Sequence, residues 1–133
     1  MNKFKNDLVY GINNENKIKS IIEKNFNLSI LKTDNLHPFD FQSDNIYFEV
    51  KSRRCLKNQY LDTMIGYNKI KWLKENNFID AYFIFVFEDG NYYHKYINDD
   101  KNCSVRIGGR WDRGKVEKKL YYYIPTKDLK ILI

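Results

Sequence analysis

The order of the predicted elements indicates an α/β fold, in which helices pack against a mixed β-sheet. A helix with one apolar stripe comes first, followed by a short strand and a β-hairpin. A second helix then leads into residues 81–87, a strand that is apolar at every position and is therefore expected to be buried on both faces. With 133 residues and 43% hydrophobic residues, the chain is predicted to form one domain over 1–133.

The first helix is predicted to begin at Asn13 or Asn14, because asparagine caps helices, and to end at Asn27. This start places Glu15 in the first turn. Residues 28–32 are the candidate strand that follows. The apolar residues that recur at helical spacing and form the buried stripe are Ile18, Ile21, Ile22 and Phe26.

Residues 37–51 predict a tight β-hairpin with Asp44 and Asn45 as its two-residue turn. In this register Asp40 faces Glu49 across the ladder. Because side chains alternate along a strand, Asp40, Glu49 and Lys51 are expected to share one face. The residues expected to point from the other face into a core are Phe39, Phe41, Ile46, Phe48 and Val50.

Two carboxylates that face each other across a ladder repel. A fold tolerates this arrangement most easily when a divalent cation lies between them, and carboxylate oxygens suit Mg²⁺. The hairpin therefore points to a metal-dependent phosphodiesterase.

The rest of the chain supplies a second helix and further strands. The helix is predicted to be capped by Asp62 or Thr63 and to end near Asn76. Residues 88–91 form a strong hairpin-turn signal, and residues 92–97 are the returning strand. Residues 105–114 are predicted to be half strand and half glycine-rich loop. A last strand over 120–124 is stopped by Pro125, and 126–129 form a helical turn.

The net charge of +6 and the pI of about 9.2 favour a polyanionic partner. Lysine enrichment from an AT-rich genome explains the same balance, and the charge alone leaves both explanations open. Cys55 and Cys103 lack metal-ligand spacing and are far apart, which indicates a reducing compartment. His94 alternates within a predicted strand and is given no function. Without a signal peptide or an apolar run long enough for a membrane, we expect a soluble, intracellular, cytoplasmic protein.

The element order and the Asp40…Glu49-Val50-Lys51 spacing resemble the PD-(D/E)XK nuclease superfamily over roughly the first two-thirds of the chain. The resemblance implies a restriction-endonuclease-like mixed β-sheet flanked by helices, with an αβββαβ core. Pro38 precedes the first acid by two positions instead of one, which is a minor departure. In size the chain is most similar to small resolvases and phage or virus nucleases.

The resemblance implies that Asp40, Glu49 and the Val50 carbonyl hold Mg²⁺ or Mn²⁺. Lys51 would stabilise developing negative charge, a role that we favour over that of a base because it needs no depressed pKa. Glu15 corresponds to a helix glutamate of the superfamily and would be an outer or second-metal ligand. An ordinary first-turn glutamate, favoured by the helix dipole, explains it equally well.

Basic residues follow the predicted active strand and recur near the C-terminus. Basic side chains at such positions suit contacts with phosphates. A glycine-bearing loop with an aromatic residue also suits stacking on bases or sugars. The resemblance implies that the second helix supplies a polar residue to the site, for which Lys69 is the candidate, although a solvent-facing helix lysine is the commoner case. For the C-terminal loop the alternative is a bulged strand pair with Trp111 in the core. The predicted nucleic-acid-binding residues are Arg53, Arg54, Lys57, Lys69, Arg106, Arg110, Arg113 and Lys115.

Three functions are compatible with these patterns. The first is a Mg²⁺-dependent DNA endonuclease, structure-selective for junctions or branches because so small a chain has little room for a sequence-reading domain. The second is a catalytically silent nucleic-acid-binding module on the same fold, and the third is a structural protein with an incidental acidic hairpin. RNA as substrate and exonucleolytic action remain open. A homodimer is expected if one small site is to cut two strands.

Overall fold

The computed structural model describes the backbone of residues 3–110 and 117–133, and the side chains of residues 15–108 and 119–133. Its helices are α1 (Lys3–Phe26), α2 (Tyr67–Glu75) and the 3₁₀ turn η1 (Thr126–Asp128). Its strands are β1 (Leu31–Lys32), β2 (Phe41–Ser43), β3 (Ile46–Ser52), β4 (Asp62–Gly66), β5 (Asp80–Phe87), β6 (Gly90–Lys95), β7 (Ser104–Arg110), β8 (Glu117–Pro125) and β9 (Lys130–Ile131).

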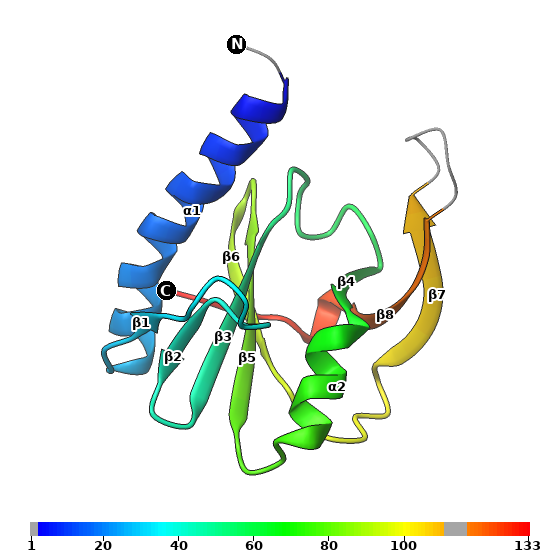
Figure 1. Cartoon of the computed structure of the whole chain (residues 1–133). Helices are drawn as coiled ribbons and strands as arrows, with labels where there is room; N and C mark the ends of the chain where they lie inside the picture. The colour runs from blue at the N-terminus through cyan, green and yellow to red at the C-terminus, as the bar shows by residue number, and fades with distance from the viewer. Residues whose placement is uncertain (1–2, 111–116) are drawn as a thin grey trace.

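The strands form two sheets (Figure 1). Sheet A has the order β1-β2-β3-β5-β6-β9, and sheet B has the order β4-β8-β7. In sheet A, β3 is antiparallel to β2 but parallel to β5, so the sheet is mixed. The connection from β3 to β5 runs through β4 and α2. This arrangement confirms the predicted restriction-endonuclease-like fold, with β4 added to the αβββαβ core.

The predicted hairpin register is confirmed. Phe41 pairs with Phe48, and Ser43 pairs with Ile46 around the turn. Asp44 has a φ of 50°, a left-handed conformation that aspartate adopts more readily than most residues. The ladder begins at Phe41, so Asp40 lies just outside it, and its N–H donates to the Phe48 carbonyl at 3.0 Å.

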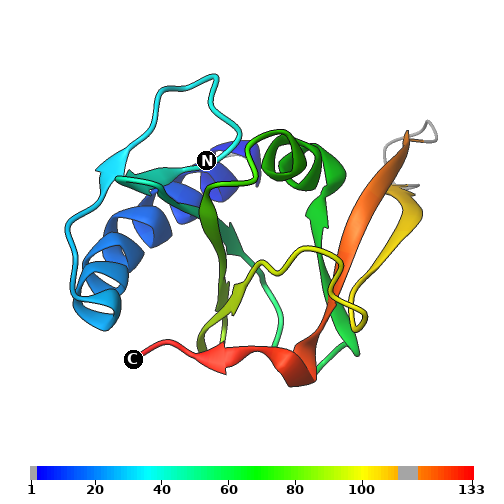
Figure 2. The same cartoon turned by 90° about the horizontal axis from the view of Figure 1, so that it is seen from below.

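Sheet A is covered on both faces (Figure 2). The α1 helix packs on one face over a core cluster that includes Ile22, Phe48 and Ile84. The α2 helix and sheet B cover the other face over a second cluster. Phe39 is 1% exposed but belongs to this second cluster, so the prediction that it shares a face with Phe41 is wrong. Strand alternation does not extend to Phe39, because it precedes β2.

The start of α1 differs from the prediction. The helix begins at Lys3, ahead of Asn13 and Asn14, and Glu15 therefore lies in its interior and not in its first turn. An asparagine inside a helix costs at most about 0.7 kcal/mol relative to alanine, which is too little to stop it. The predicted end is confirmed, because α1 ends at Phe26 and Asn27 adopts a left-handed φ of 53°.

The start of α2 also differs, because residues 62–66 form β4 and not the first turns of the helix. Thr63 and Ile65 are buried on one face of β4, and the strand pairs antiparallel with β8. The helix then begins at Tyr67 with Gly66 as its N-cap residue. A tertiary partner far along the chain thus overrides the local helical signal. The short strand β9 was not predicted either.

The predicted helical turn after Pro125 is confirmed as η1. Residues 130–131 then pair with β6, so the chain passes from sheet B back to sheet A at its C-terminal end (Figure 2). Among the described residues, no helix has the length and apolar character needed to span a membrane.

Candidate active site

The structure brings Asp40 and Glu49 together. Glu49 lies in the middle of β3, on the face that α2 covers, and is only 2% exposed. Asp40 is held beside β3 because its Oδ2 accepts a hydrogen bond of 2.8 Å from the Val50 N–H. Its carboxyl group lies close enough to that of Glu49 to act on its pKa both as a hydrogen-bonding partner and as a negative charge. The predicted acid pair is therefore formed, with its two carboxyl groups close together at one end of the hairpin.

Burial, reinforced by the hydrogen bond and the charge of Asp40, raises the pKa of Glu49 to about 7. The positive charges of Lys51 and Lys69 offset part of this rise. Glu49 Oε2 is buried and has no hydrogen bond of standard geometry within the described structure, although two ammonium groups attract it. Near neutral pH, Glu49 therefore keeps its proton in a large fraction of the metal-free molecules.

Two lysines reach Glu49 from different elements. Lys51, two residues along β3, places its Nζ 3.5 Å from Glu49 Oε2, and its side chain is 36% exposed. Lys69 of α2 places its Nζ 3.0 Å from the same oxygen and also donates to the Pro38 carbonyl. The side chain of Lys69 is 16% exposed, so it does not face solvent as the commoner interpretation had it. Lys69 thereby ties α2 to both halves of the hairpin.

A third lysine connects Glu15 to the acid pair. Lys32 of β1 places its Nζ 2.5 Å from Glu15 Oε1 and 3.8 Å from Asp40 Oδ1. Lys32 could not be singled out from its neighbours in the sequence, because its position depends on the pairing of β1 with β2, in which Lys32 faces Phe41. Glu15 thus belongs to the same cluster of charges. It is connected to Glu49 through Lys32 and Asp40.

The resulting cluster contains as many carboxylates as ammonium groups. Its members are Glu15, Asp40, Glu49, Lys32, Lys51 and Lys69. All ligand atoms that its acids offer are oxygens, which suit Mg²⁺ or Mn²⁺. Together with the buried Glu49 oxygen that lacks a directed partner, they fit a hard divalent cation.

Two of the arginines predicted to bind nucleic acid contact the protein itself. Arg53 donates from Nη2 to the Met64 carbonyl at 2.6 Å, and burial lowers the pKa of its guanidinium. Arg106 donates to Asp62 Oδ2 at 2.7 Å and stacks on the Tyr123 ring at 3.8 Å. These contacts attach the segment after β3 to β4, and β7 to both β4 and β8.

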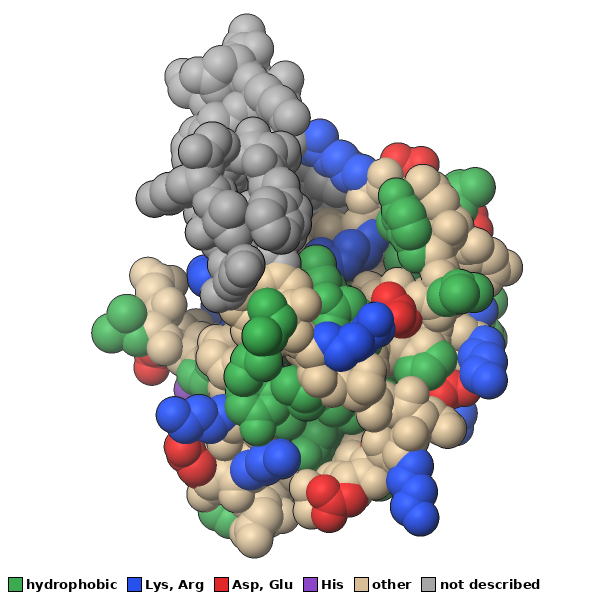
Figure 3. Space-filling model, turned by 90° about the vertical axis from the view of Figure 1, so that its right-hand side faces the viewer, with side chains coloured by type: hydrophobic (Ala, Val, Ile, Leu, Met, Phe, Trp, Pro, Cys, Tyr) green, Lys and Arg blue, Asp and Glu red, His purple; other side chains and the backbone are tan. Residues whose placement is uncertain are grey.

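The other predicted contacts lie on the surface or beyond the described side chains. Arg54 is exposed, and the Lys57 ammonium lies 5.0 Å from the centre of the Tyr92 ring. The side chains of Arg110, Trp111, Arg113 and Lys115 lie outside the described residues. On the described part of the face that carries β7, lysines and arginines are dispersed among acidic and apolar side chains (Figure 3). That part of the face has no continuous basic stripe.

The comparison with protein families extends the resemblance. A family model with the description "Phage putative PDDEXK endonuclease" matches residues 9–132. Comparison with curated proteins finds no match. The matched residues run from the first half of α1 through β9, so they include the acid pair, its lysines and both sheets. The chain therefore belongs to this family of phage PD-(D/E)XK endonucleases.

Proposed function

We propose that this chain hydrolyses DNA phosphodiester bonds as a divalent-metal-dependent endonuclease, with Asp40, Glu49 and Lys51 as its catalytic residues. The observation that carries the proposal is the buried Glu49 carboxyl in contact with Asp40, with two lysines directed at it. Burying such a pair costs free energy, and in a hairpin with a purely structural role this cost would only destabilise the fold. A catalytic site recovers that cost when it binds its cation and substrate.

Asp40 and Glu49 would hold Mg²⁺ or Mn²⁺, with the Val50 carbonyl as a further oxygen donor. When bound, the cation supplies positive charge at the scissile phosphate and makes a nearby water more acidic. The Val50 N–H fixes one Asp40 oxygen, which leaves the other free to turn toward a ligand. Glu49 is oriented by Lys69 from the side of α2.

Lys51 is the basic residue best placed to meet the substrate. It is more exposed than Lys69, and its ammonium group contacts only Glu49 in the described structure. Lys51 would contact the phosphate and stabilise the negative charge that develops during hydrolysis. Lys69 keeps its hydrogen bond to the Pro38 carbonyl and serves to position the acid pair.

The charge balance of the cluster has a consequence for binding. Three carboxylates already face three ammonium groups, so a divalent cation alone adds uncompensated positive charge. The phosphates of the substrate provide the compensating negative charge. Binding of the cation and of DNA should therefore strengthen each other, and the two effects must be equal in free energy.

For the substrate we propose branched or junction DNA, cut by a homodimer. The second candidate is a catalytically silent nucleic-acid-binding module on the same fold. What favours it is that three lysines already form ion pairs with the acids of the cluster without a metal.

A cleavage panel separates the two candidates. Supercoiled, linear, flapped and four-way DNA and one RNA are incubated with the full chain in Mg²⁺, in Mn²⁺ and without metal. The proposal predicts metal-dependent cleavage with a preference for branched DNA, and none by Asp40→Asn. Binding without cleavage of any substrate in either metal would support the silent module and overturn the nuclease.

A further inference from the structure

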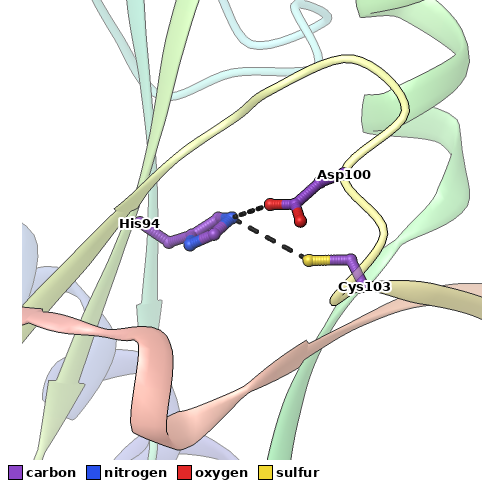
Figure 4. Close-up of side chains that lie close together, drawn as sticks. All are labelled: His94, Asp100 and Cys103. Atoms are coloured by element: carbon purple, nitrogen blue, oxygen red, sulfur yellow. Dashed lines mark hydrogen bonds and ion pairs between the residues drawn. The ribbon is translucent and has the colours of Figure 1, made fainter.

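A second cluster of possible metal ligands lies between the two sheets (Figure 4). His94 of β6 is 8% exposed and points from sheet A toward the loop that joins β6 to β7. Asp100 lies in this loop, and Cys103 precedes the first residue of β7. The ligand atoms of the three side chains all lie within 4.8 Å of one another. None of the three belongs to the Asp40–Glu49 cluster.

The distances are close to those of a zinc site. His94 Nε2 lies 3.7 Å from Asp100 Oδ2 and 3.9 Å from Cys103 Sγ. Tetrahedral zinc with bonds of about 2.1 Å to nitrogen and oxygen and about 2.3 Å to sulfur would place these pairs about 3.4 Å and about 3.6 Å apart. Each pair therefore needs to close by only about 0.3 Å, which a side-chain rotation supplies.

The same geometry argues against a cysteine nucleophile with a histidine base. In such a triad, one ring nitrogen faces the nucleophile and the other faces the carboxylate. Here both the carboxylate and the sulfur converge on Nε2 of His94, so the ring cannot relay a proton between them. Three donors that converge on one point are instead the arrangement that a bound cation requires.

Two hydrogen bonds within the β6–β7 loop position two of the three candidate metal ligands, Asp100 and Cys103. The Cys103 N–H donates to the Asp100 carbonyl at 3.2 Å, which closes a tight turn. Asp100 Oδ1 accepts a hydrogen bond of 3.0 Å from the Asn102 N–H, which leaves Oδ2 to face His94. The turn therefore presents the carboxylate and the thiol on the same side.

The surroundings also suit a bound thiolate. The Tyr122 hydroxyl is buried, lacks a hydrogen-bond partner of standard geometry within the described structure, and lies beside Cys103. A metal-bound thiolate is an acceptor that such a hydroxyl can use, and hydrogen bonds of this kind commonly support metal ligands. Asp128 lines the same pocket as His94 and acts electrostatically on both His94 and Cys103.

We propose that His94, Asp100 and Cys103 bind one Zn²⁺ ion, which fastens the β6–β7 loop and sheet B to sheet A. Nitrogen, sulfur and carboxylate ligands favour zinc over the hard Mg²⁺ of an all-oxygen site. Water fills the fourth position. On binding, the S–H bond of Cys103 breaks, an S–Zn bond forms, and the proton passes to solvent.

Cobalt substitution provides the direct test. The full chain is stripped of metal under reducing conditions and titrated with Co²⁺, followed by displacement with Zn²⁺. We expect one equivalent of Co²⁺ to produce a sulfur-to-cobalt charge-transfer band in the near ultraviolet and the visible bands of tetrahedral cobalt. An oxygen-only site such as Asp40–Glu49 cannot produce the sulfur band.

Three variants make the assignment specific. Cys103→Ser should abolish the band, and His94→Gln should weaken Zn²⁺ binding by more than about 100-fold, since even an outer partner of a metal ligand contributes about 10–100-fold. Cys55→Ser, which removes the other thiol, should leave the band and the affinity unchanged. Zn²⁺ should raise the thermal midpoint of the wild type and of Cys55→Ser, but not that of Cys103→Ser.

The spectrum of the wild-type protein tests the zinc site even if a variant fails to fold. The zinc site would be overturned if metal-free wild type showed no sulfur-to-cobalt band at one equivalent of Co²⁺. It would also be overturned if Cys55→Ser, and not Cys103→Ser, removed the band. Both results are independent of nuclease activity.

Discussion

Glu49 is unusual because its ionisable side chain is buried. A buried carboxylate needs a partner for its charge, and here it contacts another carboxyl group as well as two lysines. The pKa of Glu49 is about 7 because burial and Asp40, which raise it, outweigh the two lysines, which lower it. Perturbed acids of this kind concentrate at functional sites, where a cation or a substrate resolves the conflict.

The raised pKa of Glu49 predicts a pH effect on the stability of the metal-free protein. Between about pH 4.5 and 7 the unfolded chain has lost the Glu49 proton while the folded chain keeps it. The folded state then binds more protons than the unfolded state, so the Glu49 contribution to the free energy of unfolding falls as the pH rises. This contribution should decrease by about 3 kcal/mol and level off above pH 7.

Urea unfolding of wild type and Glu49→Gln in chelator, at a series of pH values, measures this effect. Other carboxyl groups titrate in both proteins, so the quantity of interest is the difference between the two free energies of unfolding. That difference should shift in favour of Glu49→Gln from pH 4.5 to pH 7. A difference that stays constant with pH would show that Glu49 is not perturbed.

Lys32 should oppose metal binding. Its ammonium group lies between Glu15 and Asp40, near oxygens that a cation would use. Lys32→Met should tighten Mn²⁺ binding about fivefold or more, because two unit charges about 4 Å apart in water repel by about 1 kcal/mol. Electron paramagnetic resonance of free Mn²⁺ gives the affinity. Lys24→Met, which replaces an exposed lysine at the end of α1, is the control. Equal affinities in both variants would contradict this role.

At the scale of elements, the β2–β3 hairpin was predicted correctly because its information is local. Alternating side chains and a two-residue turn fix the register without help from the rest of the chain. The residues of β4 could not be assigned in this way, since their strand conformation depends on pairing with β8 about sixty residues later. The resemblance made Lys69 a candidate for the site, but its contact with Glu49 depends on where α2 begins, which local sequence did not predict.

The α2 helix is expected to depend on Lys69 for its attachment to the hairpin. Lys69→Met removes the ammonium group that contacts Glu49 and the Pro38 carbonyl. The free energy of unfolding at pH 8 should fall by about 1–3 kcal/mol, because a buried charged acceptor loses its partner. Cleavage should fall as well, through misplacement of the acid pair.

Lys71→Met is the matched control, since Lys71 is exposed on the same helix. It should change the free energy of unfolding by no more than about 0.5 kcal/mol. Chemical denaturation and initial cleavage rates of the two variants measure both effects. Similar losses in the two variants would mean that helix content, and not the contact with Glu49, matters.

The zinc-ligand cluster illustrates a different limit of sequence reasoning. His94 alternates within β6 like any strand residue, and Cys103 has no second cysteine at ligand spacing. Only the closure of the β6–β7 loop brings the two side chains together with Asp100. Their convergence is a property of the two-sheet arrangement, which the sequence did not predict.

At the scale of the whole molecule, the proposed active site lies at the hairpin, with α1 on one side and α2 on the other (Figure 1). Sheet B packs on the same face of sheet A as α2 and shares one core cluster with it. The segment η1–β9 returns from sheet B to sheet A, so we expect both sheets to unfold together. We therefore expect urea unfolding followed by circular dichroism and by fluorescence to give one coincident transition.

The net charge of +6 should appear as salt-dependent DNA binding. The logarithm of the affinity should fall linearly with the logarithm of salt concentration, with a slope of about −0.9 for each phosphate neutralised. With Asp40→Asn as the non-cleaving background, Arg54→Gln should make the slope less steep by about one. Lys24→Gln should not change it. A flat salt dependence in the background protein would contradict nucleic acid as the partner.

The most direct test of the catalytic site compares two aspartates of the same hairpin. Asp44 lies exposed in the turn, and Asp40 contacts Glu49 at the other end of β2. Single-turnover cleavage of the best DNA substrate in Mg²⁺ is measured for wild type, Asp40→Asn and Asp44→Asn. We predict that Asp40→Asn loses at least about 100-fold in rate but still binds DNA, as expected when a main electrostatic element of a site is removed. Asp44→Asn should cleave like wild type, and cleavage by Asp40→Asn at the wild-type rate would contradict the proposed site.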